Sequence, residues 1–477
     1  MLFNSQIFLI LFLPSVYTFY RYVKLSKEQS ILFLIFVSLV FYGYWDISLL
    51  PLLLLSILCN WIIANIYFKN HSIPILYTGV FLNLAIIGIF KYFDFFWSNI
   101  NFLISNNSYN SLGLVLPLGI SFFTFQQISY LLDLKRGAAK AYPLSHYFLY
   151  ISFFPQLIAG PIVRHNQFMQ QLDRVITASK SELNYKACIG ISLIIIGLVK
   201  KVVLGDGMAV ASDRLFDVST SVALSFSEAW LAAISFALQI YFDFSGYSDI
   251  AIGLALMFGF LLPINFNSPY KAVSLIDFWR RWHITLSLFI RDYLYISLGG
   301  NRHGYKKQYM ALLTTMLIGG LWHGAAWTFI LWGGANGLGL AINHVWKQIG
   351  IKLPVLISRT LTFIFIVATF VIFRSEDFGH ATSILMSMFY LPDFEQLYQV
   401  THLEPQGWRP PLFSPEIEAI ILTTVGLSIV WLFPNSQNLI EKIPSKSMAL
   451  PIILAISYVS IILISGKGAQ EFIYFQF

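Results

Sequence analysis

Charged side chains are scarce in this chain. Asp, Glu, Lys and Arg make up 11% of its 477 residues, whereas a soluble domain averages roughly 25%. Hydrophobic residues make up 57%, and the mean hydropathy is +0.70. So few charges cannot cover a water-exposed surface of this size, so lipid is the expected solvent for most of it. The formal charge of +7 is therefore interpreted as a topology signal rather than as a sign of nucleic-acid binding.

Cysteine and the short catalytic motifs are scarce too. The two cysteines, Cys59 and Cys188, lie far apart in or beside apolar stretches, and without a CxxC pair they predict no disulfide framework. The sequence has no HxxxH or HExxH pair, so we expect no metal site. It also has no GxSxG elbow and no GxxxxGK[ST] loop, which argues against a triad hydrolase and a P-loop ATPase.

Long apolar runs, by contrast, recur along the chain and predict an all-α, polytopic membrane protein. A spanning helix needs about 20 mostly apolar residues, so about 10 to 12 crossings are expected, with the shorter runs re-entrant or interfacial. No solenoid-like repeat or low-complexity linker divides the chain, so residues 1–477 are predicted to form one membrane domain. The runs are Ile7–Tyr20, Ile31–Tyr44, Leu52–Tyr67, Ile75–Phe93, Leu112–Leu132, Ile189–Val203, Val222–Phe242, Ile250–Leu262, Met310–Leu321, Trp327–Ile342, Leu361–Phe373, Ile417–Phe433 and Leu450–Ile464.

The loops between these runs differ in basic content, which predicts their side of the membrane. Loops poor in Lys and Arg, Phe102–Gly113 and Asp393–Pro415, are expected outside. Both termini are then outside, the number of crossings is even, and the first span is not a cleaved signal because its basic residues follow it. The loops expected in the cytoplasm are Arg21–Lys27, Lys135–Lys140, Arg164–Lys186, Lys347–Arg359 and Lys442–Lys446.

The apolar segment 153–161 carries two prolines and a glycine. Proline removes a backbone donor and kinks a helix, and broken backbone at membrane depth is tolerated only inside protein or beside a watery cavity. The segment is therefore either a re-entrant stretch beside a cavity or an ordinary kinked helix.

Ionisable side chains gather in the middle of the chain, where a membrane protein places functional groups. Asp243, Ser245, Tyr247 and Asp249 lie between two apolar runs. Asp243, Tyr247 and Asp249 are candidates for a substrate or tunnel site.

A second polar group follows within residues 277–293. Asp277 and Arg281 are four residues apart, so on a helix they can pair on one face, and Arg280 and His283 are three apart. Because Trp279 and Trp282 alternate with these charges, the segment could instead be an interfacial anchor.

One histidine, His323, lies inside a long apolar run rich in glycine. Gly319, Gly320 and Gly324 allow close approach of a backbone or a ligand, and a neutral imidazole suits proton transfer near pH 7. The alternative is a histidine that is merely hydrogen-bonded within a helix interface.

A buried imidazole without a metal, a P-loop or an acidic dyad fits general-base activation of a hydroxyl or thiol. Attack of that nucleophile on a thioester carbonyl is acyl transfer. His323 would accept the proton, while His283 or the pair Arg280 and Arg281 would orient the partner or stabilise the developing oxyanion.

At these residues the sequence closely resembles the membrane-bound O-acyltransferase superfamily, in its bacterial alginate O-acetyltransferase-like branch. The resemblance runs almost end to end, and one departure is Ser297, where proline is expected. The motifs that carry it are Leu116–Gln126, Phe154–Ile162, Tyr241–Gly253, Asn265–Tyr270, Asp277–His283, Leu298–Arg302, Leu321–Gly324 and Phe472–Phe477.

The resemblance implies a helical ring around a central tunnel, an active centre near mid-membrane, and a place in the bacterial inner membrane. It puts the near-invariant histidine of the family at His323 and its second active-site polar position at His283, and its motifs add Trp322 and Asn301 to the candidates. It implies acetyl-CoA as the cytoplasmic donor, no bound cofactor, and an extracytoplasmic SGNH-hydrolase-like partner that acetylates a polysaccharide. Relatives act on alginate, peptidoglycan, other exopolysaccharides or, with D-alanine, teichoic acid.

Two other classes of function remain open at this point. A transporter would also carry charges in the membrane, although no paired repeats with interrupted helices are visible. A scaffold of a polymer-export machine is the other. Ester-linked acetate on surface glycans would distinguish both from an acetyltransferase.

Overall fold

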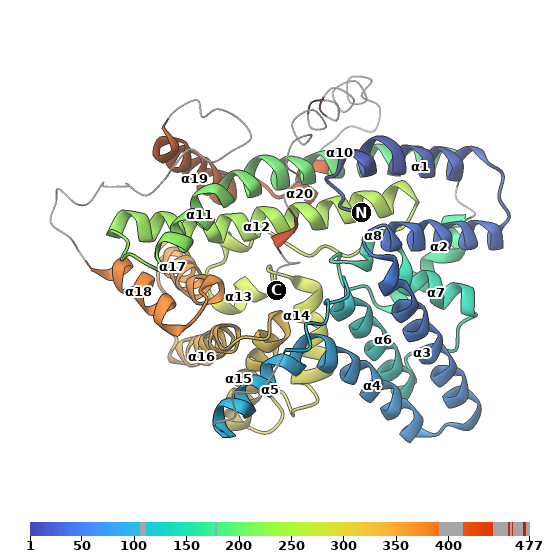
Figure 1. Cartoon of the computed structure of the whole chain (residues 1–477), viewed down its shortest axis with the longest axis horizontal. Coiled ribbons are helices and arrows are strands. Elements are labelled where there is room, and N and C mark those ends of the chain that lie inside the picture. Colours follow the sequence, from blue (N-terminus) through green and yellow to red (C-terminus); the bar gives the residue numbers. More distant parts are fainter. Residues whose placement is uncertain are drawn as a thin grey trace. The chain divides into compact units, whose positions relative to one another are not determined.

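The computed structural model describes residues 1–104, 111–176, 179–390, 414–441, 457, 460 and 471–473, and within them the regular structure is helical, with no strand. Internal contacts divide the chain into two compact units. Unit 1 comprises Met1–Ile195, Ser248–Ile264 and Ser445–Ile462, and unit 2 comprises Ile196–Tyr247, Asn265–Pro444 and Leu463–Phe477. Figure 1 labels their helices.

Unit 1 contains the helices of the first part of the chain, and its core includes a cluster of the aromatic rings of Phe8, Phe41 and Phe154. Helices α4 and α6 pack against each other, and so do α2 and α7. The elements are η1 (Ile7–Phe12), α1 (Leu13–Tyr22), α2 (Lys27–Gly43), η2 (Ile47–Leu49), α3 (Leu50–Asn70), α4 (Ile73–Ile87), η3 (Gly88–Tyr92), α5 (Phe93–Ile104), α6 (Ile120–Lys135), α7 (Leu144–Ser152), α8 (Phe154–Leu157), α9 (His165–Ile176) and α10 (Lys180–Leu198).

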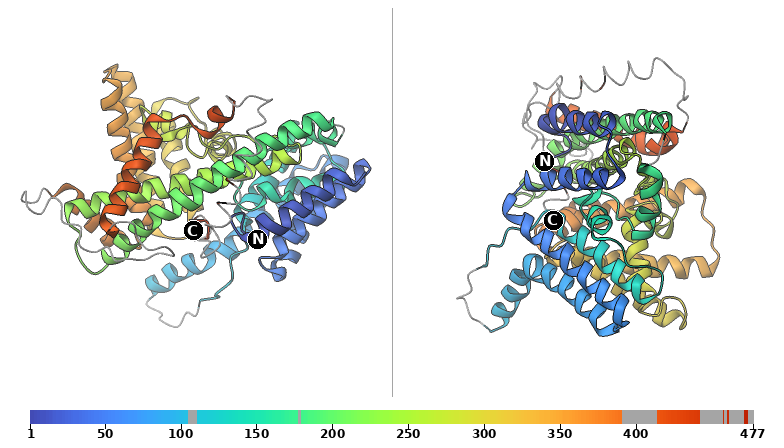
Figure 2. Two further views of the ribbon diagram at one scale, coloured as in Figure 1. Left: turned by 90° about the horizontal axis from the view of Figure 1, so that it is seen from above. Right: turned by 90° about the vertical axis from the view of Figure 1, so that its right-hand side faces the viewer.

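Unit 2 contains most of the remaining helices, and helix α12 extends from unit 2 into unit 1. Its α15 and α16 form a tightly packed helical hairpin, drawn in gold and orange in Figures 1 and 2. The elements are η4 (Val199–Gly205), α11 (Asp206–Val218), α12 (Phe226–Met257), η5 (Pro269–Lys271), α13 (Leu275–Trp279), α14 (Ile284–Ile290), η6 (Arg291–Tyr295), α15 (Tyr305–His323), α16 (Trp327–Ile349), α17 (Val355–Arg374), α18 (Phe378–Phe389), α19 (Pro415–Leu432) and α20 (Ser436–Ile440).

Within the described residues, four helical stretches are long and apolar enough to cross a membrane: Ile47–Asn70, Ile73–Ile104, Ser181–Val218 and Val355–Arg374. Exposed Leu, Ile and Phe side chains cover much of the surface of the first two, where 28% and 22% of the most apolar window is buried. These features fit the predicted polytopic helical membrane fold. The loop Lys442–Lys446, the run Leu450–Ile464 apart from Ser457 and Ser460, and all but the end of Asp393–Pro415 lie outside the described residues, so the number of crossings stays a prediction.

Two predicted helix boundaries were wrong. The run Leu112–Leu132 becomes helical only at Ile120, because Pro117 precedes it and Gly119 takes a left-handed conformation with φ +73°. A Cβ at Gly119 would lie 2.7 Å from the carbonyl oxygen of Leu157, so the chain also approaches α8 there more closely than a side chain allows.

The runs Val222–Phe242 and Ile250–Leu262, predicted as two spans, belong instead to the single 32-residue helix α12, which ends at Met257. No proline interrupts it, and its polar residues are buried rather than placed in a loop. Gly246 of this helix lies against the backbone of Gly197, and Gly253 lies against Gly190, so small residues bring α12 close to the chain before it.

The proline-containing segment 153–161 is broken backbone rather than an ordinary kinked helix. Helix α7 ends at Ser152, a single turn follows as α8, and no regular helix resumes before His165. Residues 151–163 are all buried in unit 1, which is the setting in which irregular backbone is tolerated at membrane depth.

Candidate functional site

The α15–α16 hairpin positions His323. A Cβ on Gly320 would lie 3.2 Å from the Cα of Gly333, and a Cβ on Gly333 would lie 3.2 Å from the Cα of Gly320, so the two backbones nearly touch. Helix α15 then ends at His323 because Gly324 turns to extended backbone against the ring of Phe329. The sequence therefore places His323 at a helix end inside a crossing of two helices.

Aromatic rings enclose the imidazole of His323, which is 7% exposed. The centroid of its ring lies 4.9 Å from that of Trp322, 5.0 Å from that of Trp332 and 5.3 Å from that of Phe373. Three aromatic neighbours exclude bulk water from the imidazole, so it can accept a proton from a nucleophile without competition from solvent.

His283 is held in a strained conformation with φ +42°, immediately before helix α14. Its Nδ1 lies 3.1 Å from the side-chain oxygen of Asn265, which also accepts from the backbone N–H and the hydroxyl of Thr285. Because that oxygen is the acceptor for Thr285, Nδ1 is the nitrogen of His283 that carries hydrogen, and Nε2 carries the lone pair. Burial lowers the pKa of His283 to about 3, so the ring is neutral at neutral pH.

Trp322 connects the two histidines. The ring of His283 lies 6.2 Å from the ring of Trp322, which also contacts the ring of His323 at 4.9 Å. The structure thus brings His283, Trp322 and His323 into one cluster of unit 2.

Buried polar atoms surround this cluster. Within the described chain, Nε1 of Trp279, Nε1 of Trp332 and Oδ1 of Asn336 have no hydrogen-bond partner, and the Trp279 and Trp332 rings lie 5.7 Å apart. An unsatisfied buried polar group costs about 1–3 kcal/mol, so these atoms are candidates to contact a bound substrate. Sequence reasoning named Trp279 only as an interfacial anchor and missed Trp332 and Asn336, whose one signal was their place in the run after His323.

Asp243 and Tyr247 serve a different arrangement, which sequence reasoning did not foresee. Asp243 forms an ion pair with Lys201, which also pairs with Asp206 at 2.8 Å. Lys201 donates to the carbonyl oxygen of Glu471, and Asp243 accepts from the backbone N–H of Ile473 at 3.0 Å. These groups therefore hold residues 471–473 near the C-terminus against helix α12.

Phe472 connects this anchor to the histidines. Its ring stacks on Tyr247 at 4.5 Å and contacts Phe244 at 5.6 Å. Phe244 in turn packs edge-on against His283 at 4.7 Å. Asp243 and Tyr247 thus hold the segment that contains Phe472. Phe472 in turn packs on Phe244, which contacts His283.

The remaining predictions had mixed outcomes. Arg281 and Asp277 form the expected pair at 2.7 Å. Arg280 and His283 do not share a helix face, because α13 ends at Trp279, and Arg280 is exposed. The three-residue helical spacing does not apply to this pair, because the left-handed His283 ends any continuous helix there.

Asp249 and Asn301 lie in other surroundings. Asp249 is buried on the part of α12 that belongs to unit 1. Asn301 is exposed in the turn that follows η6, between Gly300 and Gly304, which both have positive φ. Among the residues that the structure describes, no group of three or more His, Cys, Asp and Glu side chains could hold a metal ion.

The sequence matches known proteins across this site. The family model of the membrane-bound O-acyltransferases matches residues 134–373, which include both histidines. A peptidoglycan O-acetyltransferase of Helicobacter pylori is 41% identical over 81% of this chain and 80% of its own length. A probable alginate O-acetylase, AlgI, of Pseudomonas putida is 34% identical over the whole of both chains. A teichoic acid D-alanyltransferase of Bacillus subtilis is 28% identical over 55% of this chain and 70% of its own. With a family model that covers half its length and relatives that align from end to end, this chain belongs to the membrane-bound O-acyltransferase family.

Proposed function

We propose that this membrane O-acyltransferase moves acetyl from cytoplasmic acetyl-CoA towards a polysaccharide hydroxyl outside the bacterial inner membrane. The observation that carries the proposal is the water-excluded His323 at the α15–α16 crossing, within the part of the chain that the family model matches. An SGNH-hydrolase-like protein outside the membrane would complete the transfer, and the chain itself needs no bound cofactor.

In the proposed reaction, His323 is the general base. A hydroxyl oxygen attacks the thioester carbonyl, and His323 accepts the hydroxyl proton as the new C–O bond forms. The C–S bond then breaks, and the thiolate leaves and takes up the proton. His283 is either a second group in contact with the substrate or a positioning residue that acts through Trp322.

The acceptor is a cell-envelope or secreted glycan. Alginate-like exopolysaccharide is the first candidate, because AlgI relatives align with the full chain. Peptidoglycan is the second, and the 41% identity with a peptidoglycan O-acetyltransferase favours it specifically. Transfer of D-alanine to teichoic acid is a weaker third, since that relative matches a smaller share of the chain.

The test is replacement of His323 in a strain that depends on this chain for ester-linked acetate. His323→Gln should lower the acetate released from surface glycans by at least about 100-fold, the lower end of a general base's contribution. His303→Gln is the matched control, because His303 is exposed in the same unit and should change nothing. Unchanged acetate in a deletion strain would point to a transporter or a scaffold instead.

A further inference from the structure

Unit 1 contains a cavity of about 700 Å³ that no part of the proposed transfer chemistry uses. Its wall includes the loop of residues 137–143, in which Gly137, Ala138, Ala139 and Ala141 leave the space open because their side chains are small. The remaining wall comes from the start of α2, from α7 and from one face of α9. The cavity is within the usual range for small-molecule sites, about 300–1,000 Å³.

Hydrogen bonds from side chains hold the backbone of the loop of residues 137–143. The hydroxyl of Tyr130 donates to the carbonyl oxygen of Lys140 at 3.0 Å, and Nε1 of Trp61 donates to that of Tyr142 at 2.9 Å. Donors on helices α6 and α3 therefore hold the loop backbone at Lys140 and at Tyr142. Such a wall is preorganised, so a ligand would not have to order it on binding.

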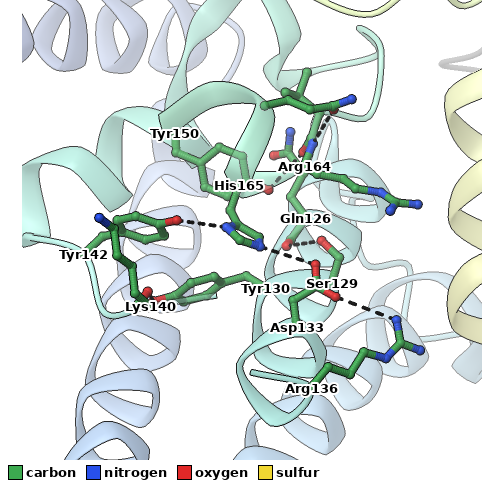
Figure 3. A network of polar contacts seen from close by, with 12 residues as sticks. Gln126, Ser129, Tyr130, Asp133, Arg136, Lys140, Tyr142, Tyr150, Arg164 and His165 are labelled. Carbon is green, nitrogen blue, oxygen red and sulfur yellow. Dashed lines mark hydrogen bonds and ion pairs between the residues drawn. The ribbon is translucent and has the colours of Figure 1, made fainter. Parts of the chain in front are cut away.

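His165 also lines the cavity, and Figure 3 shows the polar contacts that hold its ring. His165, 2% exposed, has Nε2 at 3.3 Å from the carboxylate of Asp133 and Nδ1 at 3.0 Å from the hydroxyl of Tyr142. Arg136 lies 3.7 Å from the same carboxylate. Asp133 therefore has two polar partners, His165 and Arg136, and it is not among the residues that line the cavity.

The groups that face the cavity favour an anion. Lys27 and Lys140 line it, and within the described residues Lys140 forms no ion pair. The first turns of α7 and α9 also line it, and the N–H groups of a first helical turn have no carbonyl partner within the helix. The one carboxylate in the wall, Asp173, pairs with Lys27. The hydrogen bond and charge of Lys27 lower the pKa of Asp173, with smaller effects of His146 and Lys140.

We propose that this cavity binds a phosphate-bearing small molecule, with Lys27 and Lys140 as the charged contacts and the first turns of α7 and α9 as backbone donors. A cation and N–H groups from two helix ends, on a fixed wall, match the several oxygens of a phosphate better than a single carboxylate. Two kinds of molecule could supply the phosphate group: a soluble nucleotide and the headgroup of an anionic lipid. The three basic segments that contribute here, 21–27, 135–140 and 164–186, were all predicted to face the cytoplasm, where both sources occur.

The test measures binding of adenosine bisphosphate to the purified full chain in detergent free of phospholipid, by calorimetry at low salt. Wild type should bind, and Lys140→Gln should weaken binding by roughly tenfold, the size of a charge-assisted hydrogen bond. Asp173→Asn should strengthen it, because Lys27 is then released to the ligand. Lys24→Gln is the control, since Lys24 is exposed in the same basic segment but does not line the cavity.

A lipid arm separates the sources. In nanodiscs, phosphatidylglycerol in place of phosphatidylcholine should leave nucleotide affinity unchanged if the ligand is soluble, and should compete with the nucleotide if a headgroup occupies the cavity. Absence of both nucleotide and phosphatidylglycerol binding in wild type would overturn the proposal. So would equal affinity in wild type, Lys140→Gln and Asp173→Asn. The His323 activity test does not enter these measurements, so failure of either proposal leaves the other standing.

Discussion

At the scale of single residues, Asn265 determines the protonation of His283. Its side-chain oxygen accepts from Thr285 and therefore receives the hydrogen of Nδ1. The motif that contains Asn265 was visible in the sequence, but its partner was not. The contact depends on the left-handed backbone of His283, which has no sequence signature in a non-glycine residue.

Asn265→Asp should therefore change the pH dependence of acetyl transfer. A carboxylate beside Nδ1 raises the pKa of His283, so the ring is charged in a pH range where the wild-type ring is neutral. Activity in membrane vesicles should fall at the acidic end and recover as pH rises. A variant with lower activity but the wild-type pH profile would mean that Asn265 has only a structural role.

The ion pairs of Lys201 could not be predicted from the sequence. It lies in an apolar run where a lysine is expensive, and that cost was a usable signal. Its two carboxylate partners, Asp206 and Asp243, come from different helices, and only the fold reveals that they meet.

Replacement of Lys201 by Met should leave Asp243 buried without its cation. Breaking a buried pair in this way costs about 3–5 kcal/mol, so the thermal midpoint in detergent should drop. Adding Asp243→Asn should recover part of the loss, because it neutralises the more buried of the two carboxylates, Asp243 and Asp206, that lose their cation. A double variant as unstable as the single one would contradict this reading of the pair.

At the scale of elements, the hairpin of α15 and α16 depends on Gly320 and Gly333. Apolar runs predicted both helices, Met310–Leu321 and Trp327–Ile342, and the structure extends each of them by a few residues. The glycines also indicated a close approach. The sequence could not predict that α16 is the helix that approaches these glycines, because the spacing of residues in one run does not encode which helices pair.

Gly320→Ala should separate the two helices and lower transfer with no change to His323 itself. The new Cβ would overlap the carbonyl oxygen of Phe329 and press on Gly333, so either the crossing opens or the loop that holds His323 shifts. Gly334→Ala on α16 is the matched control, because its Cβ would meet only a leucine methyl group at 3.4 Å. Equal activity and stability of these two variants would show that the contact is dispensable.

At the scale of the whole molecule, composition alone predicted the class, an all-helical membrane protein with few charges. The predicted helix boundaries were wrong where backbone conformation decides them, at Gly119 and within α12.

Topology is a further prediction at this scale. Reporter fusions at Lys442 and Phe477 should place the first in the cytoplasm and the second outside, and two cytoplasmic reports would contradict the charge-based orientation.

In the proposed reaction, the water-excluded imidazole of His323 carries the proton during acyl transfer. The most direct measurement is the ester-linked acetate on surface glycans in strains that carry His323→Gln or His303→Gln, with equal amounts of each protein in the membrane. Ester-linked acetate should fall by about two orders of magnitude or more with His323→Gln. It should stay at the wild-type amount with His303→Gln. Near-normal acetate with His323→Gln would contradict this role of His323.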